Sequence, residues 1–149
     1  MKLVHASCVA VDGKGVLLRG PSGSGKSDLA LRLIDAGAEL VADDYVELTA
    51  QAESVRAAPP DRLAGLIEVR GLGLVRLPHR SRVALRLVVD LVPTQAVERL
   101  PDATTETLAG IELPRLLVAA HDISAPAKIR LMLRLVETPE GGDYGLEPL

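Results

Sequence analysis

The segment from Gly20 to Ser27 constrains the fold of this chain more than any other, because it is a complete G-x-x-x-x-G-K-[ST] phosphate-binding motif. An apolar run at 16–18 precedes the motif, and apolar residues recur after it at helical spacing until Gly37. Strand, loop and helix is the order that the motif needs, because backbone N–H groups and the positive end of the helix then converge on the phosphates. We predict that the following residues bind a nucleotide: Gly20, Pro21, Ser22, Gly23, Ser24, Gly25, Lys26 and Ser27. In this motif the lysine reaches the β- and γ-phosphates and the serine hydroxyl ligates Mg²⁺, so the predicted cofactors are ATP and Mg²⁺.

The composition predicts one domain with an aliphatic core. The chain has 149 residues, of which 48% are hydrophobic, with no Phe, no Trp and two Tyr. Leu, Val, Ile and Ala must therefore fill the core, and stacking of nucleic-acid bases on aromatic side chains is not expected. The formal net charge is −3 and the charges are interspersed, which argues against a nucleic-acid partner.

The predicted location is the cytoplasm. No apolar run has the length of a membrane span, and the N-terminus lacks the pattern of a secretion signal. Cys8 cannot form an intrachain disulfide and lies in an apolar stretch, so we expect it in the core.

Extended and helical patterns alternate along the chain. The sequence Asp12-Gly13-Lys14 predicts a hairpin turn between strands at 3–11 and 15–19. A helix is expected from near Ser124 and Pro126 to Val136, followed by a Pro/Gly-rich acidic tail. We expect further strands at 39–42, 45–48, 66–75, 83–92 and 115–120, a polar connection at 49–65 with room for one short strand, and a turn-rich segment at 93–110. The predicted fold class is therefore α/β, a mixed β-sheet with flanking helices and a P-loop, with residues 1–137 as the domain and 138–149 as a flexible tail.

Two carboxylates end the strand that follows the helix of the motif. Asp43 and Asp44 lie at an edge where ligands of open α/β sheets gather, and phosphoryl transfer needs a group that accepts or orients a proton. Because side chains alternate along an extended chain, the two acids cannot face the γ-phosphate equally, and one is expected to act as base and the other in Mg²⁺ or backbone contacts. Asp90 is a rival acid after an apolar run, although Leu91 and Val92 continue that strand and place Asp90 inside it.

Four segments resemble the HPr kinase/phosphorylase family, whose ATP-dependent activity phosphorylates a serine of the phosphocarrier protein HPr. They are His5, the motif at 20–27, Leu40-Val41-Ala42-Asp43-Asp44, and the run from Leu66 to Val75 that contains Glu68-Val69-Arg70-Gly71-Leu72-Gly73. The resemblance covers residues 4 to 136 and only the kinase domain of the family. It implies an HPr-kinase/PEP-carboxykinase-like fold, an HPr-like substrate protein and a homo-oligomer, which is a hexamer in the family.

The resemblance also assigns roles to residues. It implies that Asp43 is the proton acceptor for the attacking serine hydroxyl, that Lys26 contacts the phosphates, and that Ser27 and Glu68 hold Mg²⁺. His5 and Arg99 match the remaining catalytic positions, and Asp44 and Arg70 are supporting residues. Without the resemblance, His5 reads as a structural histidine of a strand and Arg99 as a solvated charge. Glu68 lies on an apolar strand, where a buried carboxylate needs a compensating cation.

Three departures from the family pattern bear on the reverse, phosphorylase reaction and on docking. The segment at 77–82 is short, the stretch at 123–128 replaces Pro-Val-x-x-Gly-Arg, and a short tail replaces the C-terminal helix that helps to grip HPr. Lys128 stands where the arginine of the motif binds phosphate and Arg130 is displaced, so the resemblance implies weak or absent phosphorylase activity. Two alternatives stay open, a small-molecule P-loop kinase and a non-catalytic nucleotide-sensing module.

Overall fold

The fold of residues 1–148 consists of one large sheet, a small two-stranded sheet and two α-helices. The computed structural model describes residues 1–148. In this part of the chain the strands are β1 (Lys2–His5), β2 (Ser7–Val11), β3 (Lys14–Arg19), β4 (Glu39–Ala42), β5 (Tyr45–Ala50), β6 (Val55–Ala58), β7 (Leu66–Val69), β8 (Gly73–Arg76), β9 (Val83–Leu91), β10 (Thr104–Leu108) and β11 (Ile111–Val118). The helices are α1 (Lys26–Asp35) and α2 (Ala125–Glu137), with short 3₁₀ helices η1 (Asp61–Leu63) and η2 (Thr94–Ala96).

Strand β9 organises the sheet because it pairs with three strands. Its start pairs antiparallel with β6, its later residues pair parallel with β11 on the same edge, and β3 runs parallel along its other edge. From β11 the order continues as β9, β3, β2 and β4, and from β6 as β5 and β1. A register shift occurs where Gly15 of β3 meets β9, and a Cβ at Gly15 would lie 2.7 Å from the backbone oxygen of Ala84. Glycine is therefore required there for the two strands to pair.

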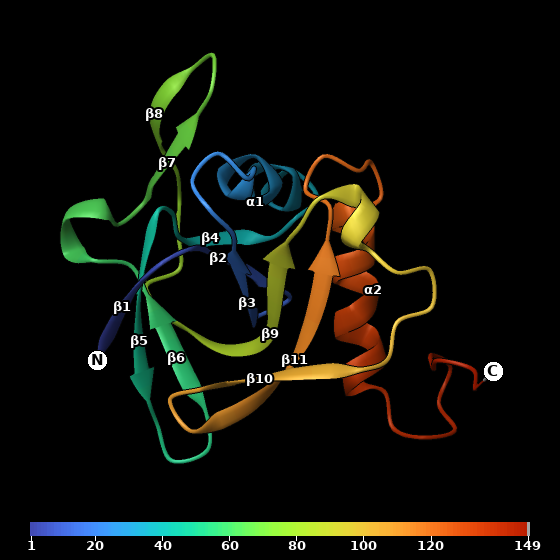
Figure 1. Cartoon of the computed structure of the whole chain (residues 1–149). Coiled ribbons are helices and arrows are strands. Elements are labelled where there is room, and N and C mark those ends of the chain that lie inside the picture. Colours follow the sequence, from blue (N-terminus) through green and yellow to red (C-terminus); the bar gives the residue numbers. More distant parts are fainter. Residues whose placement is uncertain (149) are drawn as a thin grey trace.

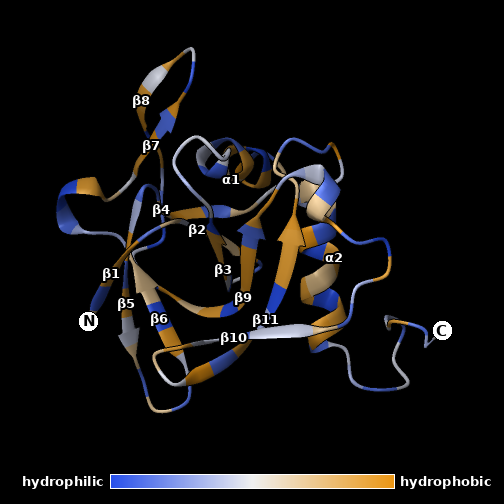
Figure 2. Ribbon diagram, in the orientation of Figure 1, coloured by the Kyte–Doolittle hydropathy of each residue, from blue (hydrophilic) through white to orange (hydrophobic). Residues whose placement is uncertain are grey.

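Both faces of the central strands are covered. Helices α1 and α2 lie on one face, and strands β5 and β6 with the β10–β11 hairpin cover the other (Figure 1). The apolar segments of β9 and β11 stand out in Figure 2. The cores on both faces are aliphatic, as the composition predicts, because all their large buried side chains are Leu, Ile and Val. The α/β class with a mixed sheet is thus confirmed.

Helix α1 begins and ends where the sequence predicts. It starts at Lys26, directly after the glycine-rich loop, and Gly37 has φ +112°, a conformation that glycine adopts without strain. The N–H of Ala38 donates to the carbonyl of Leu33 at 3.0 Å, which satisfies one of the last carbonyls of the helix. Helix α2 also forms where it is expected, at 125–137.

Several predicted strands differ from the structure. The single strand expected at 3–11 is two strands that separate at Ala6, whose N–H donates to the carbonyl of Asp44, so that β1 pairs with β5 and β2 with β3 and β4. The run at 66–75 is not part of the large sheet but forms the separate β7–β8 hairpin, which projects from the body in Figure 1. The turn-rich segment at 93–110 contains β10, whose polar Thr-Thr-Glu-Thr sequence hid the strand.

The C-terminal tail has no helix or strand in residues 138–148, and Leu149 lies outside the described residues. The guanidinium of Arg134 lies over the ring of Tyr144, 5.3 Å from its centroid. The expected flexibility of this segment stays a prediction.

Cys8 lies in the core, and its solvent exposure is 0%. Burial raises the pKa of the thiol, which disfavours the thiolate that reacts with disulfide reagents in the native chain. We expect DTNB to label native Cys8 about 10² times more slowly than the urea-unfolded chain. Rapid labelling in native buffer would contradict the buried position.

Candidate functional site

A cleft of about 650 Å³ opens above the N-terminus of α1, at the carboxyl ends of β3, β9 and β11. This edge is where open α/β sheets bind ligands. Its walls come from segments that are far apart in sequence, namely β1, β2, the glycine-rich loop, α1, the β4–β5 turn, β7 and the β11–α2 loop. The lining residues are His5, Ser7, Ser22, Gly23, Gly25, Lys26, Ser27, Asp28, Leu31, Asp44, Glu68, Val69, Arg70 and His121. Most of the residues predicted from the sequence are therefore brought together.

The glycine-rich loop, residues 20–25, turns tightly at its glycines. Gly23 and Gly25 have φ of +80° and +100°, which side-chain-bearing residues rarely adopt. A Cβ at Gly20 would lie 2.5 Å from the Oγ of Ser24, so the loop closes tightly on itself. That Ser24 hydroxyl is buried and has no hydrogen-bond partner among the described residues. A phosphate bound in the loop would be an acceptor for it.

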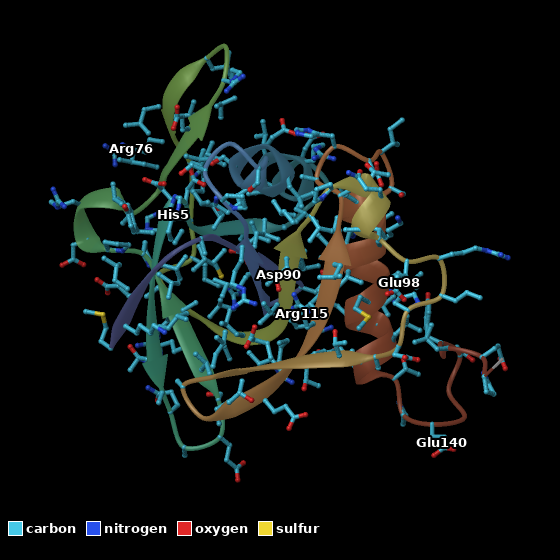
Figure 3. The ribbon with its side chains drawn as sticks, in the orientation of Figure 1. His5, Arg76, Asp90, Glu98, Arg115 and Glu140 are labelled. Carbon is cyan, nitrogen blue, oxygen red and sulfur yellow. The ribbon has the colours of Figure 1, made fainter. Side chains whose placement is uncertain are left out.

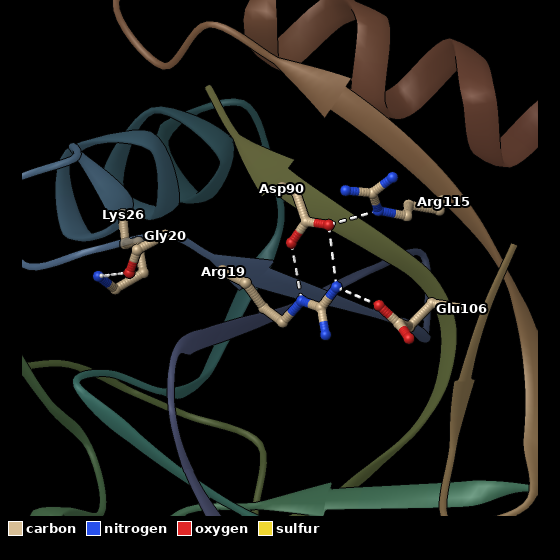
Figure 4. Close-up of polar contacts among 6 residues, drawn as sticks. All are labelled: Arg19, Gly20, Lys26, Asp90, Glu106 and Arg115. Atoms are coloured by element: carbon tan, nitrogen blue, oxygen red, sulfur yellow. Dashed lines mark hydrogen bonds and ion pairs between the residues drawn. The ribbon is translucent and has the colours of Figure 1, made fainter. Parts of the chain in front are cut away.

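Lys26 points into this loop. Its Nζ donates to the carbonyls of Gly20 at 2.7 Å and Pro21 at 3.1 Å, and the first of these contacts appears in Figure 4. The residue is 7% exposed, and burial lowers the pKa of its ammonium group, while the nearby charges of Asp44 and Asp43 oppose that effect. An ammonium group held only by neutral carbonyls is a binding group for anionic oxygens.

Asp43 is the best-connected carboxylate of the site. Its Oδ1 accepts hydrogen bonds from the hydroxyls of Ser7 and Ser27, both at 2.7 Å, and its Oδ2 accepts the backbone N–H of Glu68 at 3.1 Å. The residue is 5% exposed and lies beneath the cleft rather than in its lining. Ser7 was not predicted as a site residue, and because a serine in an apolar strand has no distinctive sequence pattern, only its contact with Asp43 reveals it.

Asp44 faces the cleft, in contrast to Asp43. Its φ of +70° turns the chain between β4 and β5, a conformation that Asp tolerates better than most residues. The side chain is 62% exposed, and its Oδ1 lies 3.0 Å from the Nε2 of His5. The ring of Tyr45 lies 5.4 Å from the ring of His5, between centroids. The two acids thus face differently, as predicted, with one carboxylate inside and one at the cleft, but the turn at Asp44 separates them rather than alternation along an extended strand.

Glu68 and Arg70 reach the cleft from β7 and the β7–β8 turn. Both are exposed, so the expectation of a buried Glu68 carboxylate is wrong. The reason is that β7 belongs to a two-stranded hairpin outside the large sheet, and alternate residues of such a hairpin face solvent.

Arg99, a predicted catalytic residue, does not line the cleft and makes no hydrogen bond or ion pair with its residues within residues 1–148. It is exposed, follows η2, and is absent from the residues that line the cleft. Its neighbour Glu98 lies well away from His5 in Figure 3. Lys128 and Arg130 are also outside the lining, and Arg130 lies beside a small separate cavity near Asp12 and Gly37.

Asp90 is bound by two arginines and does not enter the cleft. Arg19 donates from Nε to Oδ1 at 2.7 Å and from Nη2 to Oδ2 at 2.9 Å, and Arg115 donates to Oδ2 at 2.5 Å (Figure 4). Arg19 also donates to Glu106, so the network joins β3, β9, β10 and β11. Burial alone would raise the pKa of Asp90, but the hydrogen bonds from Arg19 and Arg115 outweigh it and hold the pKa below its ordinary value. The alternative of Asp90 as the acid of the nucleotide site is therefore not supported by its position.

The substitution Asp90→Asn should lower the free energy of unfolding at pH 7 by about 2 kcal/mol, because it leaves Arg19 and Arg115 facing each other at a half-buried position. A carboxyl whose folded pKa is depressed stabilises the protein above its unfolded pKa of about 4 and loses this contribution as the pH falls. The difference between wild type and variant in urea unfolding should therefore shrink at pH 3. An equal difference at both pH values would contradict this, and the exposed Glu53→Gln variant serves as control.

His121 lines the cleft and was not predicted from the sequence. It follows β11 in the loop that leads to α2, and a Cβ built on Gly25 would lie 3.3 Å from its Cε1. Its place after an expected strand was the only signal in the sequence, because a single histidine in a loop forms no motif.

The residues of the cleft fit a magnesium ion shared with phosphates. No cluster of three or more His, Cys, Asp or Glu side chains arranged to hold a metal occurs in residues 1–148. Mg²⁺ commonly takes one or two protein ligands and completes its shell with phosphate oxygens and water. The Ser27 hydroxyl next to the Asp43 carboxylate supplies such oxygens, and the Glu68 carboxylate lines the same cleft.

Neither helix is a membrane span. Helix α2 is the longer of the two at 13 residues, and over residues 1–148 no helix combines the length and the apolar character needed to cross a bilayer.

Comparisons with known proteins point to one family. Residues 1–132 match the family model of the HPr Serine kinase C-terminal domain. The chain is 41% identical over 127 residues to the HPr kinase/phosphorylase of Bordetella pertussis and 38% identical over 130 residues to that of Geobacillus thermodenitrificans. Each alignment covers 77% of this chain and 41% of the relative, so the chain spans less than half the length of these curated relatives. The structure resembles that of the Hpr(Ser) kinase/phosphatase from Coxiella burnetii with a TM-score of 0.80 and 28% identity, covering 90% of this chain and 89% of that one. The chain therefore belongs to the family of the HPr Serine kinase C-terminal domain.

Proposed function

We propose that the chain is an ATP-dependent protein kinase that phosphorylates a serine of an HPr-type phosphocarrier protein. The observation that carries the proposal is the meeting of the Lys26–Ser27 end of the glycine-rich loop with Asp44 and His5 in one cleft. Phosphoryl transfer needs a donor phosphate held in place and a group that takes the proton of the attacking hydroxyl, and this cleft offers both. The family and the relatives support HPr as the substrate.

We propose Asp44, rather than Asp43, as the proton acceptor. The Asp43 carboxylate accepts hydrogen bonds from the hydroxyls of Ser7 and Ser27 and from the N–H of Glu68, and it lies beneath the cleft. Asp44 lies in the lining, where a substrate hydroxyl can reach it, and His5 orients its carboxylate by the contact of 3.0 Å. In the reaction the Asp44 carboxylate takes the serine proton, the serine oxygen bonds to the γ-phosphorus, and the bond to the ADP oxygen breaks.

The other residues bind and position the phosphates. We assign Lys26 and the backbone of the glycine-rich loop to the phosphate oxygens, and Ser27 with Asp43 to the magnesium side of the cleft, with Glu68 as a further carboxylate. When bound, Mg²⁺ neutralises charge on the transferred phosphate. Arg70 adds a positive charge at the rim, and Arg99 has no role that its position in this chain supports.

We also propose a cytoplasmic location, because the proposed transfer draws on ATP. Weak or absent phosphorylase activity stays a prediction, which the absence of Lys128 and Arg130 from the cleft lining supports. Assembly into a homo-oligomer also stays a prediction, and sedimentation of the purified chain tests it.

The test incubates the purified chain with Mg²⁺, ATP and the HPr of its own organism, and locates the phosphate by mass spectrometry. Phosphate on one HPr serine is the expected result. Label on a metabolite panel with none on HPr would replace the proposal by a small-molecule kinase. ATP binding without any transfer would replace it by a nucleotide-sensing module.

A further inference from the structure

The glycine-rich loop lies between two other loops at the same edge of the sheet. The strand order β4, β2, β3, β9, β11 places the end of β4 two strands from the loop on one side and the end of β11 two strands from it on the other. Asp43 and Asp44 follow β4, and His121 follows β11 shortly after Val118. The cleft thus has one side with Asp44 and an opposite side with His121, and the glycine-rich loop lies between them. The first is called the carboxylate side below.

This arrangement sets the direction of a bound nucleotide. The transferred phosphate must face the carboxylate side, because the proton acceptor and the substrate hydroxyl meet there, and the attacking and leaving oxygens lie roughly in line with the phosphorus. The nucleoside end must then leave the loop on the other side. His121 is the residue of the cleft lining that lies on that side, beside Gly25.

The loop that carries His121 is held in place from α1. Arg32 donates from Nη2 to the carbonyl of Ala120 and from Nη1 to that of Asp122 at 3.3 Å, so the residues on both sides of His121 are anchored. The imidazole itself is exposed and makes no side-chain hydrogen bond within residues 1–148. A positioned ring without an internal partner is available to a ligand.

We infer that His121 binds the nucleoside part of ATP, with its imidazole packed against the base or ribose. The inference rests on the proposed function. The chain has no Phe or Trp, Tyr45 lies beside His5 on the carboxylate side, and Tyr144 lies over Arg134 in the tail. His121 is therefore the only planar ring that the described residues place at the nucleoside end of the cleft. It acts in binding and not in the transfer step.

The experiment compares ATP with inorganic tripolyphosphate, which has the phosphates without the nucleoside, by calorimetry in the presence of Mg²⁺. His121→Ala should raise the Kd for ATP about tenfold, the effect of losing one ring contact to a base, and should change the Kd for tripolyphosphate by less than about twofold. His121→Phe keeps a planar ring and should stay within about threefold of wild type for ATP. Ile123→Ala, at a position 98% exposed in the same loop and outside the lining, is the matched control and should bind both ligands normally.

Each outcome decides the inference. Equal weakening of ATP and tripolyphosphate by His121→Ala would show a phosphate contact and would overturn it, as would unchanged ATP binding. Loss of affinity in His121→Phe equal to that in His121→Ala would also count against ring packing. A wild-type chain that binds neither ligand would refute the proposed function and the inference together, whereas normal wild-type binding with an unaffected variant would refute the inference alone. Thermal unfolding of each variant verifies that the fold is intact.

Discussion

Lys26→Ala is expected to raise the Kd for ATP by about 10² to 10³ and to reduce phosphoryl transfer to HPr below detection. The variant removes the positive charge that the loop presents to the phosphates, and charge-assisted contacts of this kind are the strong ones in such sites. The Nζ donates only to the carbonyls of Gly20 and Pro21, so the alanine variant leaves no buried carboxylate unpaired. Calorimetry with ATP and a radiolabel transfer assay measure the two effects.

Lys128→Ala is the matched control for this prediction. Lys128 is exposed on α2 and lies outside the cleft lining, so ATP binding and transfer should remain at the wild-type level. Normal ATP affinity in Lys26→Ala, with the fold verified by circular dichroism, would show that the glycine-rich loop is not the phosphate site.

Asp44→Asn is expected to lower the rate of transfer by about 10² to 10⁴ while the Kd for ATP changes by less than about threefold. The amide has nearly the shape of the carboxylate but cannot take the serine proton, and positioned proton acceptors contribute rate factors of this size. The side chain is 62% exposed, so the fold should tolerate the change. Single-turnover transfer to HPr at saturating ATP and Mg²⁺ isolates the affected step.

Asp43→Asn distinguishes the two acids. Asp43 accepts three hydrogen bonds, two of them from Ser7 and Ser27, and an amide can accept on only one of its two atoms. We therefore expect a lower unfolding temperature and a higher Mg²⁺ requirement, with transfer partly restored at high Mg²⁺. If Asp44→Asn transferred phosphate normally and Asp43→Asn did not, even at saturating Mg²⁺, the proton acceptor would be Asp43, as the sequence resemblance implies.

The elements around the glycine-rich loop could be predicted because their signals are local. The motif, the apolar spacing after it and Gly37 together predict α1, and each of these acts within a few residues of the chain. Strands β7 and β8 could be predicted as strands but not as a separate hairpin, because partner choice depends on residues elsewhere in the fold. Strand β10 was missed because its polar residues pair with β11 at the edge of the sheet, where no apolar alternation is needed.

The site shows the same difference between features with local sequence signals and features that depend on distant residues. The sequence by itself determined the phosphate loop, the paired aspartates and the resemblance through Glu68-Val69-Arg70, since each is a contiguous pattern. Only the tertiary structure decided which aspartate is buried, that Glu68 is exposed, that Arg99 lies outside the cleft and that His121 lies within it. The physical reason is that these properties depend on which strands are neighbours in the sheet and on the direction of each side chain at its edge. Strand neighbours and side-chain directions both depend on contacts between residues separated by up to about a hundred positions in the chain, and no local sequence pattern encodes such contacts.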